Sequence, residues 1–371
     1  MKTLKIITFC TLLISTFVCC HKNKDSDYFN GDIRYFNDDN KIVKNVKSKS
    51  VPLNGLNYGM IAIYDSLLIC WNPKLPNHFF NIFNVDTGEE IGAFCKRGRG
   101  PQEMVAVSCI FQFFKKENDI MTLLYATNES KLFFWNISKS LEKGVTVWDT
   151  IVSLTNKRTD EYRSYNFLFF QPEETLFAYV QSNFLREEEA TTPFYEKRKI
   201  FTDESLRDYP IYKKKSVQNA IKSPISLFYS WDVFKPDGSK IVQAMRNLSQ
   251  INILNIHTGE VVGYRMQNCP NFSYLETNMQ SMKVYYNSIQ TDDNYMYATY
   301  WGREPWDTSI YAQIPFFNIV HVFDWDGKLL YELITDRVFF RIWLDQVRNR
   351  LYSYNHDTDE VYYIDLNELS L

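Results

Sequence analysis

The chain has 371 residues, of which 45% are hydrophobic, 16% aromatic and 23% charged, with a formal net charge of −3. This hydrophobic content excludes an intrinsically disordered chain, and the small negative charge argues against a nucleic-acid-binding protein, whose surface would be basic. The aromatic residues, 28 Phe and 25 Tyr, favour strands over helices.

Residues 1–19 are predicted to be a signal peptide. Lys2 and Lys5 precede an apolar run over residues 6–18, which has the length of a signal-peptide core and is too short to span a bilayer. We therefore expect an exported protein.

The apolar run ends in two cysteines, and a cysteine at this place resembles a bacterial lipobox, where it is acylated. Cys20 is the expected lipidation site, because Cys19 then supplies the small residue before the cut, although Phe17 departs from the usual leucine. The alternative is conventional cleavage beside two ordinary cysteines. Several acyl chains would anchor the protein firmly, so we expect an outer-membrane lipoprotein of the cell envelope, with residues 20–50 as its tether.

Four further cysteines, Cys70, Cys95, Cys109 and Cys269, allow three pairings into two disulfides. We expect unpaired thiols, because a core of this size needs no covalent links and a buried cysteine packs as a small hydrophobe. No pair has the spacing of a zinc site, and we predict no metal.

Two kinds of hairpin alternate along the chain. Residues 79–94, 249–266 and 318–335 each contain an apolar run, a turn with glycine and a second apolar run. Five segments of the second kind, 60–72, 166–181, 231–245, 287–302 and 341–356, join two short strands through a polar turn. Two such hairpins make a four-stranded antiparallel sheet, and radial repetition of these sheets makes a β-propeller.

The repeat predicts an all-β fold with six four-stranded blades over residues 51–371. The blades are expected to begin near residues 60, 107, 165, 230, 288 and 340. Seven shorter blades would also fit the length, but only six pairs of hairpins are identifiable. Because the last blade has three recognisable strands, residues 32–46 are predicted to supply its missing outer strand.

Two motifs resemble those of the TolB-like six-bladed propeller lipoproteins of Bacteroidetes. One is "IVHVFDWDGKLLYEL" at 319–333 with the strands that follow it, and the other is "CKRGRGPQEM" at 95–104, in which Gln102 stands where a small residue is common. The resemblance covers essentially the whole chain. It implies the propeller fold and an envelope location, and it implies no activity.

The loop "GRGPQE" has glycines and cations that suggest a phosphate site, but Pro101 removes an N–H group and a strand-like run follows it. We therefore interpret Gly98, Gly100, Pro101 and Glu103 as a structural loop between blades. The alternative is a ligand role, in which Arg97 and Arg99 clamp a carboxylate.

A long aromatic loop at 299–315 is the second candidate for recognition. Tyr300, Trp301 and Trp306, together with Arg303, offer rigid apolar surface with polar groups, as binding sites often do. The alternative is that these aromatics fill the space between blades.

The sequence favours a non-catalytic binding module for a protein or glycan partner, monomeric and without a cofactor. No catalytic motif occurs, and no catalytic residue is predicted. The alternative function is an enzyme, a lyase or hydrolase, whose axial site is assembled from several blades.

Overall fold

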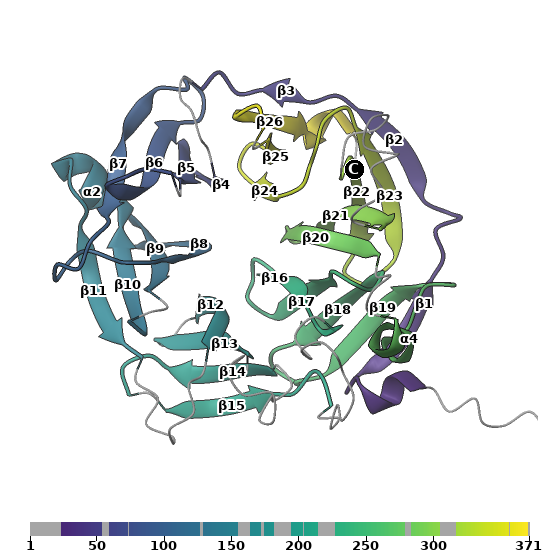
Figure 1. Ribbon diagram of the computed structural model, residues 1–371. Coiled ribbons are helices and arrows are strands. Elements are labelled where there is room, and N and C mark those ends of the chain that lie inside the picture. Colours follow the sequence, from purple (N-terminus) through teal and green to yellow (C-terminus); the bar gives the residue numbers. More distant parts are fainter. Residues whose placement is uncertain are drawn as a thin grey trace, which may run out of the picture.

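Six sheets stand around one axis and form a closed ring (Figure 1). The structure is a computed structural model, and it describes residues 24–53, 59–72, 74–126, 129–154, 164–171, 174–181, 194–202, 204–213, 227–278, 283–304, 317–355 and 357–369. The predicted all-β fold with six blades is confirmed.

Each blade takes its strands in chain order from the axis outward. The first blade contains β4 (Met60–Tyr64), β5 (Leu67–Trp71), β6 (His78–Asn84) and β7 (Glu90–Lys96). The second contains β8 (Ser108–Lys116), β9 (Asp119–Ala126), β10 (Lys131–Asn136) and β11 (Trp148–Ser153), and the third β12 (Ser164–Gln171), β13 (Thr175–Gln181), β14 (Phe194–Lys199) and β15 (Ser205–Tyr209). The fourth contains β16 (Ser230–Phe234), β17 (Lys240–Met245), β18 (Gln250–Asn255) and β19 (Val261–Met266). The fifth contains β20 (Val284–Thr291), β21 (Tyr295–Arg303), β22 (Ile319–Asp324) and β23 (Leu329–Thr335), and the sixth β24 (Ile342–Asp345), β25 (Arg350–Asn355) and β26 (Glu360–Asp365). These first strands begin close to the six predicted positions.

The N-terminal segment runs around the rim and corrects one prediction. Residues 32–46 do not complete the last blade: β1 (Asp32–Phe36) and β2 (Ile42–Val46) add fifth, parallel strands to the fourth and fifth blades. The sixth blade is completed by β3 (Lys49–Ser50), antiparallel to β26. The chain reaches the sixth blade only after passing the two blades before it, so the closing strand lies later in the sequence than predicted.

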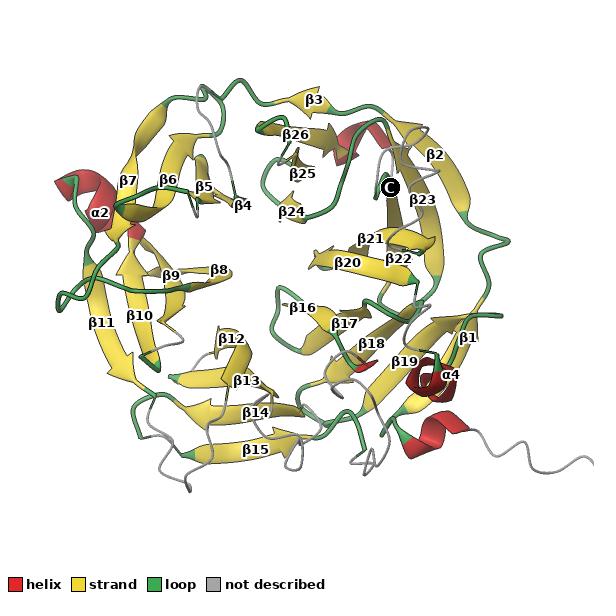
Figure 2. Cartoon of the chain, in the orientation of Figure 1, coloured by secondary structure: helices red, strands yellow, loops and turns green. Residues whose placement is uncertain are grey.

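Helices are short and lie at the edges of the ring (Figure 2). The helices with described bounds are η1 (Lys24–Asp27), α2 (Ile137–Lys143), α4 (Phe272–Thr277) and η4 (Leu366–Leu369). Within the described ranges, no helix has the length and apolar character needed to cross a bilayer.

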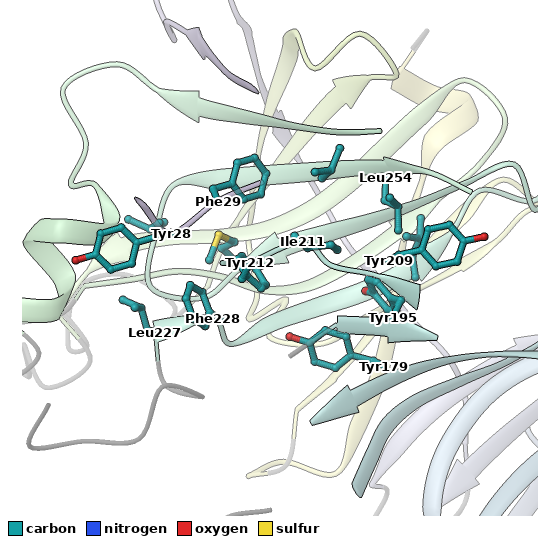
Figure 3. Packing of buried hydrophobic residues seen from close by; sticks show 14 of the residues in the cluster. Tyr28, Phe29, Tyr179, Tyr195, Tyr209, Ile211, Tyr212, Leu227, Phe228 and Leu254 are labelled. Atoms are coloured by element: carbon teal, nitrogen blue, oxygen red, sulfur yellow. The ribbon is translucent and has the colours of Figure 1, made fainter. Parts of the chain in front are cut away.

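Among the described residues, six clusters of the core each lie between two neighbouring blades, and a small seventh cluster contains Val284, Trp301 and Phe317. Side chains of a strand alternate between its two faces, so one strand contributes to two clusters. In β17, Ile241 packs toward the third blade and Val242 toward the fifth. Figure 3 shows the cluster between the third and fourth blades, where Tyr195, Tyr209 and Phe228 pack together.

The two faces of the ring differ in their connections. Because neighbouring strands are antiparallel, the link from second to third strand and the link to the next blade lie on the same face in every blade. On that face begin and end the long connections 97–107, 210–229, 267–283 and 304–318, and we call it the long-loop face. The opposite face carries mostly short turns, and we call it the short-turn face.

The structure describes the side chains of three of the four cysteines that were predicted to be unpaired. Cys70 is free and fully buried, and Cys269 is free and partly exposed. Burial raises the pKa of both thiols, so they resemble packing residues more than reactive thiolates. Cys95 is buried as well, and the side chain of Cys109 lies outside the described atoms.

Candidate functional site

A cavity of about 160 Å³ lies at the axis of the ring. Its walls come from β4, β12, β16, β20 and β24, the innermost strands of five blades, together with Tyr354 of β25. Most of the lining is apolar and includes Met60, Phe167, Phe169, Trp231, Ile289 and Trp343. We call it the axial cavity.

Arg341 is the cation of the axial cavity. It directly precedes β24, and its guanidinium lies 3.4 Å from the centre of the Trp231 ring. The Arg341 carbonyl accepts a hydrogen bond from Ser353 Oγ at 2.7 Å, but no hydrogen bond or ion pair joins the guanidinium to another residue in the part of the chain that the structure describes. Burial lowers the pKa of Arg341 to about 10, so the side chain is still charged at neutral pH. Its five N–H donors are therefore available to a ligand.

A second arginine lies beside the first. Arg246 directly follows β17, donates a hydrogen bond from Nη1 to Asn287 Oδ1 at 2.6 Å, and lies 5.9 Å from the Tyr229 ring centre. The positive charge of Arg246 contributes to lowering the pKa of Arg341, after burial as the main cause. No described carboxylate lies within ion-pair distance of either arginine, so this end of the cavity has a net positive charge.

Asp232 is the acid of the cavity wall, and its oxygens are occupied. Ser230 Oγ donates to Oδ1 at 2.6 Å, and the Tyr195 hydroxyl and Gln243 Nε2 donate to Oδ2. Burial raises the pKa of Asp232 to about 6. Through Tyr195, which Figure 3 shows in the cluster, the carboxyl joins the fourth blade to the third.

The loop after β7 folds around the side chain of Glu103, a carboxylate of the protein itself. Gly100 N donates to Glu103 Oε2 at 3.0 Å, and Lys96 Nζ lies 3.0 Å from Oε1. A side chain at Gly98 would place its Cβ 1.8 Å from Glu103 Oε2. The loop therefore needs glycine at 98, because the Glu103 carboxylate lies too close for a side chain there. A Cβ at Gly100 would lie 3.1 Å from the same carboxylate, which leaves more room. Pro101 is exposed.

The two arginines of this loop have different surroundings. The Arg97 guanidinium lies 3.9 Å from the centre of the Phe79 ring, and its Nε donates to the His78 carbonyl at 3.0 Å. Arg99 is exposed. The Arg97 guanidinium is thus held by its own blade, and the carboxylate clamp of Arg97 and Arg99 stays an untested alternative.

The prediction for the aromatic loop is wrong for Trp301. This side chain is 2% exposed and packs against Phe317 and Val284, because β21 extends to Arg303 and carries Trp301 into the sheet. Tyr300 is stacked on the buried His321, with ring centres 4.0 Å apart. The guanidinium of Arg303 lies 5.1 Å from the Trp301 ring centre.

Two predicted residues lie outside the described residues, namely Trp306 and the lipidation site Cys20. Among the side chains that are described, no group of three His, Cys, Asp or Glu is arranged to hold a metal ion.

Arg341, Trp231 and Arg246 were not predicted as site residues. Arg341 and Trp231 are 110 positions apart in the sequence and meet only because the ring closes. One signal was available: both stand at the start of the first strand of a repeat, where a propeller turns its side chains toward the axis.

Comparisons with known proteins agree with the propeller fold. The family model described as "TolB-like 6-blade propeller-like" matches residues 39–346. A member of the DUF4221 family from Bacteroides vulgatus has a similar structure, with a TM-score of 0.55 and 12% identity over 87% of this chain and 96% of that one. A protein from Bacteroides fragilis, named as exported, has a TM-score of 0.53 and 11% identity over 90% and 98%. No curated protein matches the sequence. At these identities the structural likeness concerns the fold alone.

Proposed function

Because this chain belongs to the TolB-like six-bladed propeller family, whose fold serves many functions, we propose a function from its axial site. The protein is an exported, lipid-anchored binding module that holds its partner, a protein or glycan, at the axial cavity without chemical conversion. The family and the fold supply the scaffold, and the cavity supplies the binding group.

The observation that carries the proposal is the unpaired Arg341 on the Trp231 ring. A partly buried charge without a counter-ion is costly for a folded protein. A ligand that supplies the missing charge would recover that cost on binding. Perturbed charged groups in a concave apolar site are common features of binding sites.

Export and anchoring are supported by the sequence and by one relative. The apolar N-terminal run ends at Cys20, and the Bacteroides fragilis protein of similar structure is named as exported. A short link separates Cys20 from Asp25, which is buried in the propeller. At about 3.5 Å per residue, an acylated Cys20 would keep the rim of the fourth blade near the membrane.

The enzyme alternative has one observation in its favour, the Asp232 carboxyl with its pKa of about 6. General acids often have raised pKa values. Both oxygens of Asp232, however, accept hydrogen bonds from its own and the neighbouring blade. Binding without catalysis therefore remains the function we propose.

A cavity-filling variant tests the proposal. Gln290 lines the cavity and is partly exposed, so Gln290→Trp should fill the space while Gln290→Ala enlarges it. The detergent-solubilised protein is incubated with envelope extract, and the components it retains are quantified by mass spectrometry. We expect wild type and Gln290→Ala to retain the same envelope components. Gln290→Trp should no longer retain them. Equal retention by all three proteins, with similar thermal melting, would contradict the proposal.

A further inference from the structure

We propose that the axial cavity binds a carboxylate carried on an apolar body, and that its source is the C-terminus of a peptide chain ending in a large apolar residue. This inference rests on the proposed function and names the chemistry of the same site. It also decides between the two classes of partner, in favour of a protein.

The charge of the ligand follows from the guanidinium of Arg341. Its planar fork of N–H donors matches the two oxygens of a carboxylate, and no described residue occupies it. The guanidinium carbon lies 3.4 Å from the centre of the Trp231 ring, and this contact restricts where the fork can lie. Arg246 adds a second positive charge, and its Nη1 is held by Asn287.

The apolar part of the ligand follows from the size and lining of the cavity. Its volume of about 160 Å³ is close to that of an engineered cavity of about 150 Å³ that binds benzene. The wall offers Phe167, Phe169 and Ile289. One phenylalanine or leucine side chain therefore fits beside a carboxylate held by Arg341.

A sugar acid fits this wall poorly. The hydroxyl groups of a uronate need hydrogen-bond partners when they leave water. The polar groups of the wall are few, and Asp232 is already bonded to Ser230, Tyr195 and Gln243. The chemistry therefore favours an apolar chain end over a glycan.

The test compares a peptide that ends in a carboxylate with the same peptide that ends in a neutral amide. Acetyl-Gly-Gly-Phe with a free carboxylate, and the same peptide as its C-terminal amide, are titrated into the detergent-solubilised mature protein by calorimetry. We expect the acid to bind at least about tenfold more tightly, because hydrogen bonds to charged groups contribute roughly 1.5–3 kcal/mol. Arg341→Gln should remove this preference while leaving thermal melting near that of wild type.

Lys143→Gln is the matched control. Lys143 is an exposed cation on α2, between the third and fourth strands of the second blade and thus on the short-turn face. This variant should keep the full preference for the acid. Phenylacetate tests whether the ligand is a free small carboxylate. If phenylacetate binds more tightly than the peptide acid, the assignment to the C-terminus of a peptide chain is overturned.

Other results would overturn the inference as a whole. These are equal affinity for acid and amide, no heat from either peptide at millimolar concentration, a preference that survives Arg341→Gln, or tighter binding of glucuronate or inorganic phosphate. The proposed function is judged separately. If envelope components are lost from Gln290→Trp but kept by Arg341→Gln, the cavity binds its partner without recognising a carboxylate.

Discussion

Asp25 and Arg265 form a buried salt bridge that attaches the start of the described chain to the fourth blade. Nη1 of Arg265 lies 2.8 Å from Oδ2 of Asp25, and the two side chains are 1% and 3% exposed. Arg265 Nε also donates to Gln250 Oε1 at 2.7 Å. The segment before β1 is therefore part of the propeller, and the structure describes the predicted tether of residues 20–50 from Lys24 onward.

Removing Asp25 should be strongly destabilising. Asp25→Ala leaves Arg265 buried without its partner, and such losses typically cost about 3–5 kcal/mol. Asp27→Ala, on the exposed side of η1, should change the free energy of unfolding by less than about 0.5 kcal/mol. Denaturant unfolding of both variants gives the comparison. A cost below about 1 kcal/mol for Asp25→Ala would mean that the pair contributes little.

Gly98 and Glu103 should be energetically coupled. Gly98→Ala pushes the Glu103 carboxylate away from Gly100 N, so it should cost about 1–2 kcal/mol, similar to Glu103→Ala. The double variant should then cost less than the sum of the two. Gly100→Ala and the exposed Arg99→Ala should have smaller effects. Additive losses in denaturant unfolding would show that the loop does not depend on this contact.

Trp301 should contribute to stability and not to binding. Trp301→Ala empties a buried aromatic site and should lower the free energy of unfolding by about 3–5 kcal/mol. Phe201→Ala, at a side chain that is 55% exposed, is the control and should change little. Retention of envelope components by folded Trp301→Ala should equal that of wild type. Stable folding together with lost retention would restore Trp301 as a ligand contact.

Asp232 should make stability depend on pH. Burial raises the pKa of Asp232 in the folded protein from 3.8 to about 6. The protonated carboxyl therefore contributes to the free energy of unfolding below about pH 4, and this contribution is lost as the pH rises through 6. Asp232→Asn should therefore gain stability relative to wild type over this window. The gain is on the order of 3 kcal/mol, since one pKa unit corresponds to about 1.4 kcal/mol. Denaturant unfolding at pH 4 and pH 7 measures it, and a constant difference between the two proteins would contradict the assignment.

The sequence predicts the blades well because local turns define them. Gly88, Gly259 and Gly327 have φ values of 73°, 81° and 77°, a conformation that favours glycine, and each marks the turn between the third and fourth strands of a blade. Alternating apolar residues on both sides of these turns then determine the sheets. These signals all lie within one hairpin, so one sequence is enough to see them.

The candidate site was not predicted, because its residues come from different blades. Trp231 belongs to the fourth blade and Arg341 precedes the first strand of the sixth. Their contact depends on the ring geometry, which no local pattern encodes. The burial of Trp301 was missed for a related reason: the length of β21, which continues to Arg303, decides whether the indole lies in the sheet or in the loop.

The most direct measurement is the indole N–H spectrum of protein carrying ¹⁵N-labelled tryptophan. Unlabelled envelope extract is silent in this spectrum, and the Trp231 signal is assigned from a Trp231→Phe sample. If the axial cavity holds the partner, the extract should shift or broaden the Trp231 signal first and leave that of Trp301 unchanged, and Gln290→Trp should abolish the effect. A spectrum in which Trp231 is unchanged while the extract is retained would place binding elsewhere on the propeller.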